Sequence, residues 1–132
     1  MASIFTKIVN GEIPAYKVAE DDRFFAFLDI NPRAEGHTLV IPKKEIDYLF
    51  DLDDNLLGDM MIFAKKVAKA QKKAIECKRV GVLVVGTEVP HAHIHLIPFK
   101  TESQVSLQSP VLKFSPEEFK EIAERIAHYI EE

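Results

Sequence analysis

The chain has 132 residues, of which 47% are hydrophobic and 29% are charged. These values are typical of one soluble globular domain, and a chain of this length can bury a core without disulfides. Cys77 is the single cysteine, which excludes an internal disulfide and a cysteine-based metal cluster. A formal net charge of −4 argues against a nucleic-acid partner bound through a basic surface. Because no signal-peptide core and no run of membrane-spanning length occur, we expect a cytoplasmic protein without a membrane partner.

The first half of the chain predicts a short helix followed by a meander of strands. Ile4, Phe5 and Ile8 fall on one helical face, and Asn10-Gly11 then breaks the helix. Three strands follow, at 16–18, 24–28 and 37–41, separated by polar turns at 20–23 and 29–32 and ended by Pro42.

The second half predicts a long helix, two strands and a terminal helix. Apolar residues step by three and four from Leu56 to Ala74, with aspartates before them and lysines after, which indicates a helix over about 53–76. The apolar run 80–85 predicts a buried strand. Ser115-Pro116-Glu117-Glu118 has the capping-box pattern that begins a helix. We therefore expect an α+β fold with a mostly antiparallel five-stranded sheet, a long central helix and a C-terminal helix.

Three histidines alternate with apolar residues in His91-Ala92-His93-Ile94-His95-Leu96-Ile97. This alternation predicts a strand with one buried face and the three imidazoles presented on the other. His91 and His95 would lie roughly 13 Å apart, which disfavours one zinc ion shared by all three rings. The row suits a linear phosphate substrate better, with one imidazole attacking and its neighbours donating hydrogen bonds. Surface histidines without a function, or a metal bound by one or two of them, remain the alternatives.

This heptapeptide matches the His-φ-His-φ-His-φ-φ motif of the histidine triad family of nucleotide hydrolases and transferases. Residues 4–14, 27–32 and 36–44 also resemble that family, in its order, and point to its Hint-like bacterial branch. The resemblance covers roughly the first hundred residues of a single domain, 1–132. It leaves 101–132 as a family-variable C-terminal extension that ends in a helix, and whether this extension shapes the leaving-group side of the site stays open.

The resemblance implies a role for each of four histidines. His93 would attack the α-phosphorus of a nucleotide and form a nucleotidyl-histidine intermediate, which water then resolves. His95 would hydrogen-bond a phosphate oxygen, and His91 would orient the nucleophile or set its proton state. His37 matches a fourth histidine near the active site, although its position also fits a half-buried residue at a strand end.

The resemblance also implies a nucleotide-binding set. Asp29 would accept hydrogen bonds from the ribose hydroxyls, with Asn31 beside it, although a turn-capping carboxylate is the alternative for Asp29. Four apolar residues would line the base pocket or, equally well by sequence, belong to the core: Phe5, Ile8, Ile30 and Leu39. Gly86, Thr87 and Glu88 form a shortened loop before the triad and would face the phosphate or the leaving group. Thr87 stands where relatives have a glutamine.

The implied activity is hydrolysis of purine nucleoside phosphoramidates, or of related nucleoside monophosphate adducts, by a homodimer. Hydrolysis of dinucleoside polyphosphates and a non-catalytic, nucleotide-binding regulatory dimer are the alternatives. Many bacterial relatives hold a structural zinc with a Cys-x-x-Cys pair and a histidine. Here Ser3, Thr6 and Glu45 occupy those positions, so we expect no metal and no cofactor.

Overall fold

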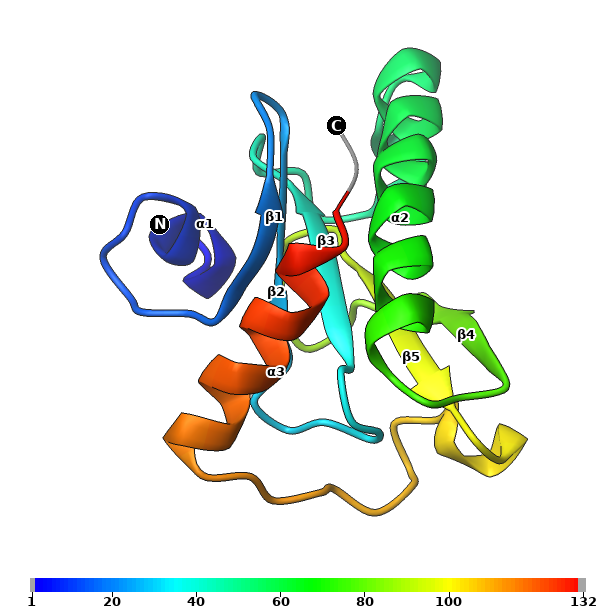
Figure 1. The fold of residues 1–132 in the computed structure, drawn as a ribbon. Coiled ribbons are helices and arrows are strands. Elements are labelled where there is room, and N and C mark those ends of the chain that lie inside the picture. The colour runs from blue at the N-terminus through cyan, green and yellow to red at the C-terminus, as the bar shows by residue number, and fades with distance from the viewer. Residues whose placement is uncertain (1, 131–132) are drawn as a thin grey trace.

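The computed structural model describes residues 2–130 and contains a five-stranded antiparallel sheet in the order β1-β2-β3-β5-β4 (Figure 1). The strands are β1 (Lys17–Glu20), β2 (Phe24–Leu28), β3 (Thr38–Pro42), β4 (Arg79–Leu83) and β5 (Ile94–Phe99). The predicted α+β class and the antiparallel five-stranded sheet are confirmed.

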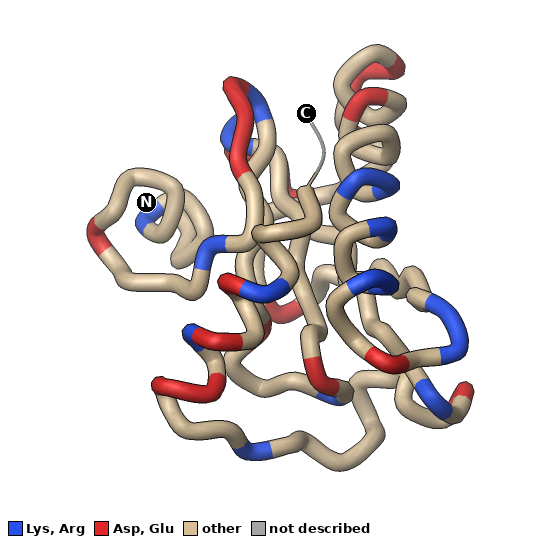
Figure 2. Tube along the Cα trace, in the orientation of Figure 1, with Lys and Arg blue, Asp and Glu red and all other residues tan. Residues whose placement is uncertain are grey.

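Three α-helices accompany the sheet: α1 (Ile4–Val9), α2 (Asp54–Ala74) and α3 (Pro116–His128), with short 3₁₀ turns at Leu49–Asp51 and Glu102–Gln104. Side-chain caps begin the two longer helices, and the predicted capping box at Ser115 is confirmed. The Asp53 side chain accepts the N–H of Leu56, and Ser115 and Glu118 form a capping box. Acidic residues gather at the start of α2 and basic ones toward its end, and this distribution stabilises the helix through its dipole (Figure 2).

The sheet is buried on both faces by two separate apolar clusters. Phe24, Ala26 and Leu28 of β2 point into the larger cluster, against α2 and α3. Phe25 and Phe27 alternate with them and pack with Phe5 of α1 in a smaller cluster. Successive strand residues face opposite sides, so the near-continuous apolar run in β2 follows from burial on both faces. The small helix α1 therefore lies against the face opposite α2 and α3 (Figure 1).

The prediction that 91–97 form one strand with an outward histidine face is wrong. β5 begins only at Ile94, because the backbone of the preceding residues makes other bonds. The N–H of Ala92 donates to the carbonyl of Ile46, and the N–H of His91 donates to that of Val89. His91 and His93 therefore lie in the segment leading into β5, and all three triad rings are buried.

The predicted buried strand at 80–85 is also corrected. β4 ends at Leu83 and is the last strand in the sheet, so one of its edges has no neighbour among residues 2–130. Val82 is 52% exposed, although its sequence context is apolar.

The chain after β5 crosses beneath the sheet before it enters α3 (Figure 1). We call residues 101–114 the strap. Its Leu112 N–H donates to the carbonyl of Pro32 at 2.8 Å, and its Val105 packs against Gly81 of β4. Within residues 2–130, no helix combines the length and the hydropathy needed to cross a membrane.

Candidate active site

A cavity of about 700 Å³ lies beside the triad, a volume in the usual range for small-molecule sites. Every residue predicted to bind substrate lines it: Phe5, Ile8, Asp29, Ile30, Asn31, Leu39, Gly86, Thr87 and Glu88. Two of the four predicted catalytic histidines, His93 and His95, line it as well. His37 and His91 are buried behind the cavity wall, 1% and 0% exposed. The fold thus assembles one site from segments that are far apart in the sequence.

The wall of the cavity is apolar on one side and polar on the other. Phe5 and Ile8 of α1 and Leu39 of β3 belong to the smaller apolar cluster. Ile30 is 66% exposed, so it offers less packed surface than these three. On the polar side, one carboxylate oxygen of Asp29 accepts the N–H of Asn31 at 2.8 Å, and the other oxygen lies toward the histidines.

His93 is held so that one ring nitrogen is free. Its Nδ1 lies 2.7 Å from the carbonyl oxygen of His91, which can only accept, so Nδ1 carries the proton. The lone pair of Nε2 is then available to attack. Phe5 packs edge-on against the ring at 5.1 Å between centroids, and a Cβ at Gly86 would lie 3.9 Å from the ring carbon Cε1. The ring is therefore oriented by α1, by its own backbone and by the loop before the triad.

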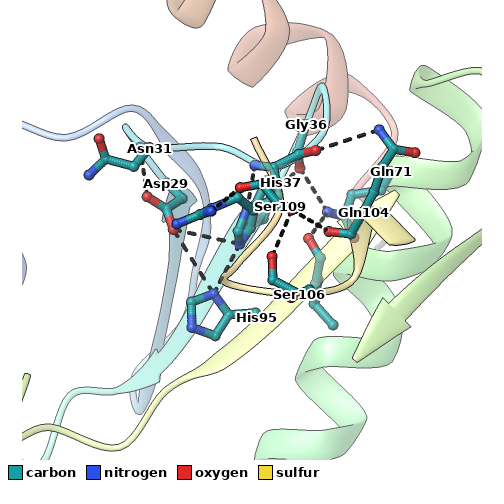
Figure 3. A network of polar contacts seen from close by, with 12 residues as sticks. Asp29, Asn31, Gly36, His37, Gln71, His95, Gln104, Ser106 and Ser109 are labelled. Atoms are coloured by element: carbon teal, nitrogen blue, oxygen red, sulfur yellow. Dashed lines mark hydrogen bonds and ion pairs between the residues drawn. The ribbon is translucent and has the colours of Figure 1, made fainter. Parts of the chain in front are cut away.

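A chain of hydrogen bonds also determines the tautomer of His95 (Figure 3). The backbone N–H of Arg33 donates to Nδ1 of His37 at 3.0 Å, so the proton of His37 is on Nε2. That Nε2–H donates to Nδ1 of His95 at 2.9 Å. His95 must then carry its own proton on Nε2, which is buried and has no partner. We call Arg33, His37 and His95 the relay.

The relay keeps both rings neutral. Burial lowers the pKa of His37 to about 4, and burial together with the neighbouring His37 lowers the pKa of His95 to about 4. Asp29 favours protonation of His37, since its carboxylate is 3.6 Å from Nε2, but burial outweighs it. At neutral pH the relay therefore offers a neutral N–H donor on a cavity-lining ring.

His91 docks the N-terminal helix. Its Nε2–H donates to the carbonyl of Pro42 at 2.7 Å, so its Nδ1 accepts the hydroxyl of Ser3 at 2.8 Å. Glu45 accepts the N–H of Ser3 and the hydroxyl of Thr6, each at 2.6 Å. These two bonds, the Ser3 bond first, lower the pKa of Glu45 to about 2. Burial lowers the pKa of His91. This network holds α1, and with it Phe5, against the triad.

Neither polar cluster fits a resident metal ion. Among residues 2–130, the donor atoms of Asp29, His37 and His95 lie within 4.8 Å of one another. A metal-bound imidazole donates its other N–H to an acceptor, whereas the other nitrogen of His37 faces the N–H of Arg33. Around His91, the partners are two hydroxyls and a carboxylate instead of the thiolates and imidazoles that zinc prefers. Both clusters suit proton placement better than metal binding.

Sequence reasoning missed Arg33 and left open whether the segment that contains the strap shapes the site. Arg33 lines the cavity and begins the relay, and residues 105–108 of the strap form part of the wall. Arg33 lies in the turn between two predicted site residues, Asp29 and His37, and this position was the available signal. The strap residues carry no motif, because their place in the wall depends on contacts with segments distant in sequence.

A family model described as HIT domain matches residues 10–102. The chain belongs to the HIT family. An uncharacterized HIT-like protein of Borreliella burgdorferi is 39% identical over 94% of this chain and 95% of its own length. The protein named adenosine 5′-monophosphoramidase hnt1 of Schizosaccharomyces pombe is 38% identical over 98% of this chain and 99% of its own.

Solved structures share the HIT fold. The crystal structure of a Hit-like protein involved in cell-cycle regulation from Bartonella henselae, with an unknown ligand, has a TM-score of 0.85 and 37% identity. The match covers 96% of this chain and 95% of that one, and it therefore reaches well beyond the HIT domain model, which ends at residue 102. In this chain most of the strap and all of α3 follow the segment that the family model matches.

Proposed function

We propose that this HIT protein hydrolyses purine nucleoside phosphoramidates, or related adducts of a nucleoside monophosphate, through a nucleotidyl-histidine intermediate. One observation carries the proposal: the lone pair of His93 Nε2 is free in a cavity that also holds the unpartnered N–H of His95. The Schizosaccharomyces pombe relative, named adenosine 5′-monophosphoramidase, supports the phosphoramidate class.

In the proposed complex the nucleotide spans the cavity from its apolar to its polar side. The base lies against Phe5, Ile8 and Leu39, and the ribose hydroxyls donate to the carboxylate of Asp29. The α-phosphate then lies at His93 and His95. This assignment leaves the group attached to the phosphate near the loop 86–88 and the strap, which supply the rest of the wall.

The first step forms a bond between His93 Nε2 and the α-phosphorus while the bond from phosphorus to the leaving amine breaks. The amine leaves with a proton taken up from solvent. The phosphoryl oxygens, on which negative charge grows, accept a hydrogen bond from the N–H of His95. The relay has already placed this neutral donor. His93 carries positive charge in the intermediate, and the carbonyl of His91 stabilises its Nδ1–H.

The second step is attack by water on the same phosphorus. The bond from phosphorus to Nε2 breaks, His93 regains its lone pair, the attacking water gives a proton to solvent, and the nucleoside monophosphate leaves. The net reaction is phosphoramidate plus water to nucleoside monophosphate plus amine. His93 is the nucleophile of the first step and the leaving group of the second, and His95 is the donor in both, so no metal is required by the proton and charge balance.

The test is an intact-protein mass spectrum, quenched shortly after mixing with adenosine 5′-phosphoramidate, while free AMP is followed in parallel. The wild type should show an adenylyl adduct and release AMP, and His93→Ala should show neither. His128→Ala is the matched control, because His128 is exposed on α3 and should behave like the wild type.

Other outcomes would replace the proposal. If the wild type turned over diadenosine polyphosphate but not the phosphoramidate, it would be a dinucleoside polyphosphate hydrolase. If it bound AMP and formed neither adduct nor product with any of these compounds, it would be a nucleotide-binding regulatory module.

A further inference from the structure

Arg33 is a cavity-lining residue with no part in the steps above except through its backbone. Its side chain donates from Nη1 to the carbonyl of Ser109 in the strap, and its Nε is buried without a partner. It forms no ion pair with a carboxylate of residues 2–130. The carboxylate of Asp29 lines the same cavity but does not pair with this guanidinium. A half-buried guanidinium without an ion-paired carboxylate is unusual, since arginine is rarely buried unless it is paired.

This charge lies close to the proposed phosphate site. Burial is the main cause of the lowered pKa of His37 and of His95, and the guanidinium adds to it by charge repulsion. The backbone N–H of Arg33 also holds His37. Within residues 2–130, four buried side-chain polar atoms lack a partner, and two of them are the N–H donors of Arg33 and His95. Both residues line the same cavity. Buried donors without partners in a concave site indicate a ligand that supplies acceptors.

The position of Arg33 relates it to the leaving group. The apolar side and Asp29 are assigned to the nucleoside, and His93 and His95 to the α-phosphate. The strap wall, Val105 to Gln108, has no nucleoside role, and the strap is what fixes the Arg33 side chain through Ser109. Glu88 places an opposite charge in the loop before the triad, but it is exposed and screened by solvent, whereas Arg33 is half-buried.

Building on the proposed function, we propose that Arg33 binds a negatively charged group of the leaving group and makes the enzyme select anionic leaving groups. The shared chemistry is an oxyanion, either the carboxylate of an amino acid joined to AMP through its amine or a second phosphate. Arginine suits both, because its planar donors match carboxylate and phosphate oxygens.

The experiment uses two adducts of AMP of nearly the same size, the phosphoramidates of glycine, which ends in a carboxylate, and of glycinamide, which ends in an uncharged amide. Arg33→Gln removes the charge and keeps an N–H donor for Ser109, and Arg33→Lys keeps the charge. Each variant is compared with the wild type on the same substrate, so the intrinsic reactivity of the two adducts cancels. Arg23→Gln is the matched control, because Arg23 pairs with Asp59 and does not line this cavity.

For Arg33→Gln we expect kcat/KM to fall about tenfold on the glycine adduct and less than about twofold on the glycinamide adduct, the discrimination expected of one lost charge contact. Arg33→Lys should retain most of the wild-type preference for the glycine adduct over the glycinamide adduct, and Arg23→Gln should retain all of it. Diadenosine triphosphate, assayed in parallel, distinguishes the two sources of the anion. A selective loss on that substrate alone would identify a second phosphate.

An equal loss on both glycine and glycinamide adducts would overturn the inference and make Arg33 a support for the strap or the α-phosphate. No loss on any substrate would overturn it too. In both cases the wild type still releases AMP from adenosine 5′-phosphoramidate, so the proposed function stands. If the wild type releases no AMP from any of these compounds, the proposed function fails and the inference fails with it.

Discussion

His37 does not line the cavity, yet its hydrogen bonds decide which ring nitrogen of the cavity-lining His95 carries the proton. His37→Leu removes the donor to His95 Nδ1, so the His95 proton is free to move to that side. We expect kcat to fall about 10²-fold with little change in KM, the usual scale for a lost proton-placing group. His37→Gln, which keeps a donor near the position of Nε2, should recover part of the loss.

A readout of the proton itself separates this positioning role from a general packing role. Nitrogen NMR of the imidazoles should find His95 protonated on Nε2 in the wild type and on a mixture of nitrogens in His37→Leu. If both variants lose activity equally and the His95 tautomer does not change, His37 is only a core residue.

The same buried rings predict how stability depends on pH. In the folded protein the pKa of His37 and of His95 is lowered to about 4, whereas an exposed imidazole titrates near 6.5. Between these values the unfolded chain binds more protons than the folded one, so the free energy of unfolding falls as pH falls from about 6.5 to about 4. Urea unfolding at a series of pH values in this window measures how steeply the free energy of unfolding depends on pH. This dependence should be shallower in His37→Gln, which has one buried imidazole fewer. An unchanged slope in that variant would contradict the assignment.

At the scale of elements, the strap and β4 meet at a position where only glycine fits. A Cβ at Gly81 would lie 2.7 Å and 3.0 Å from the two methyl carbons of Val105. Gly81→Ala must therefore push the strap away from β4, and we expect a loss of about 1–3 kcal/mol in the free energy of unfolding. Val105 also lines the cavity, so KM for the phosphoramidate should rise.

The double variant Gly81→Ala/Val105→Ala supplies the control, because it restores the space for the added methyl group. It should be more stable than the sum of the two single changes predicts, as measured by urea unfolding. Strictly additive losses would show that the strap does not press on β4 in solution.

Elements that depend on local signals were predictable from the sequence, and those that depend on distant partners were not. The caps at Asp53 and Ser115 act on their own helices, and α2 and α3 begin next to them as predicted. The start of β5 was misplaced because the N–H of Ala92 bonds to the carbonyl of Ile46, which is distant in the sequence. In the candidate site, motifs pointed to the triad and Asp29, whereas Arg33 was missed and the role of the C-terminal segment was left open.

At the scale of the whole molecule, the sheet order explains the apolar surface that the sequence suggested was core. β4 is the outer strand, so the run 80–85 keeps an open edge, and Val82, Val84 and Val85 are 52%, 40% and 52% exposed. An unpaired strand edge with apolar side chains invites pairing with another chain. We propose that two copies of the chain associate through this edge as a homodimer.

Sedimentation equilibrium should then give twice the mass of a single chain. Val82→Lys should shift the protein toward the single-chain mass, because it places a charge on an edge that the dimer would bury. Val111→Lys is the control: Val111 is a comparably exposed apolar residue of the strap, 42% exposed, outside β4. A single-chain mass for the wild type at every concentration would contradict the proposal.

The loop 86–88 follows this edge and lines the cavity, so a dimer joined there would also stabilise the loop side of each site. Val82→Lys should therefore lower kcat/KM as it dissociates the dimer, with the activity rising again at high protein concentration.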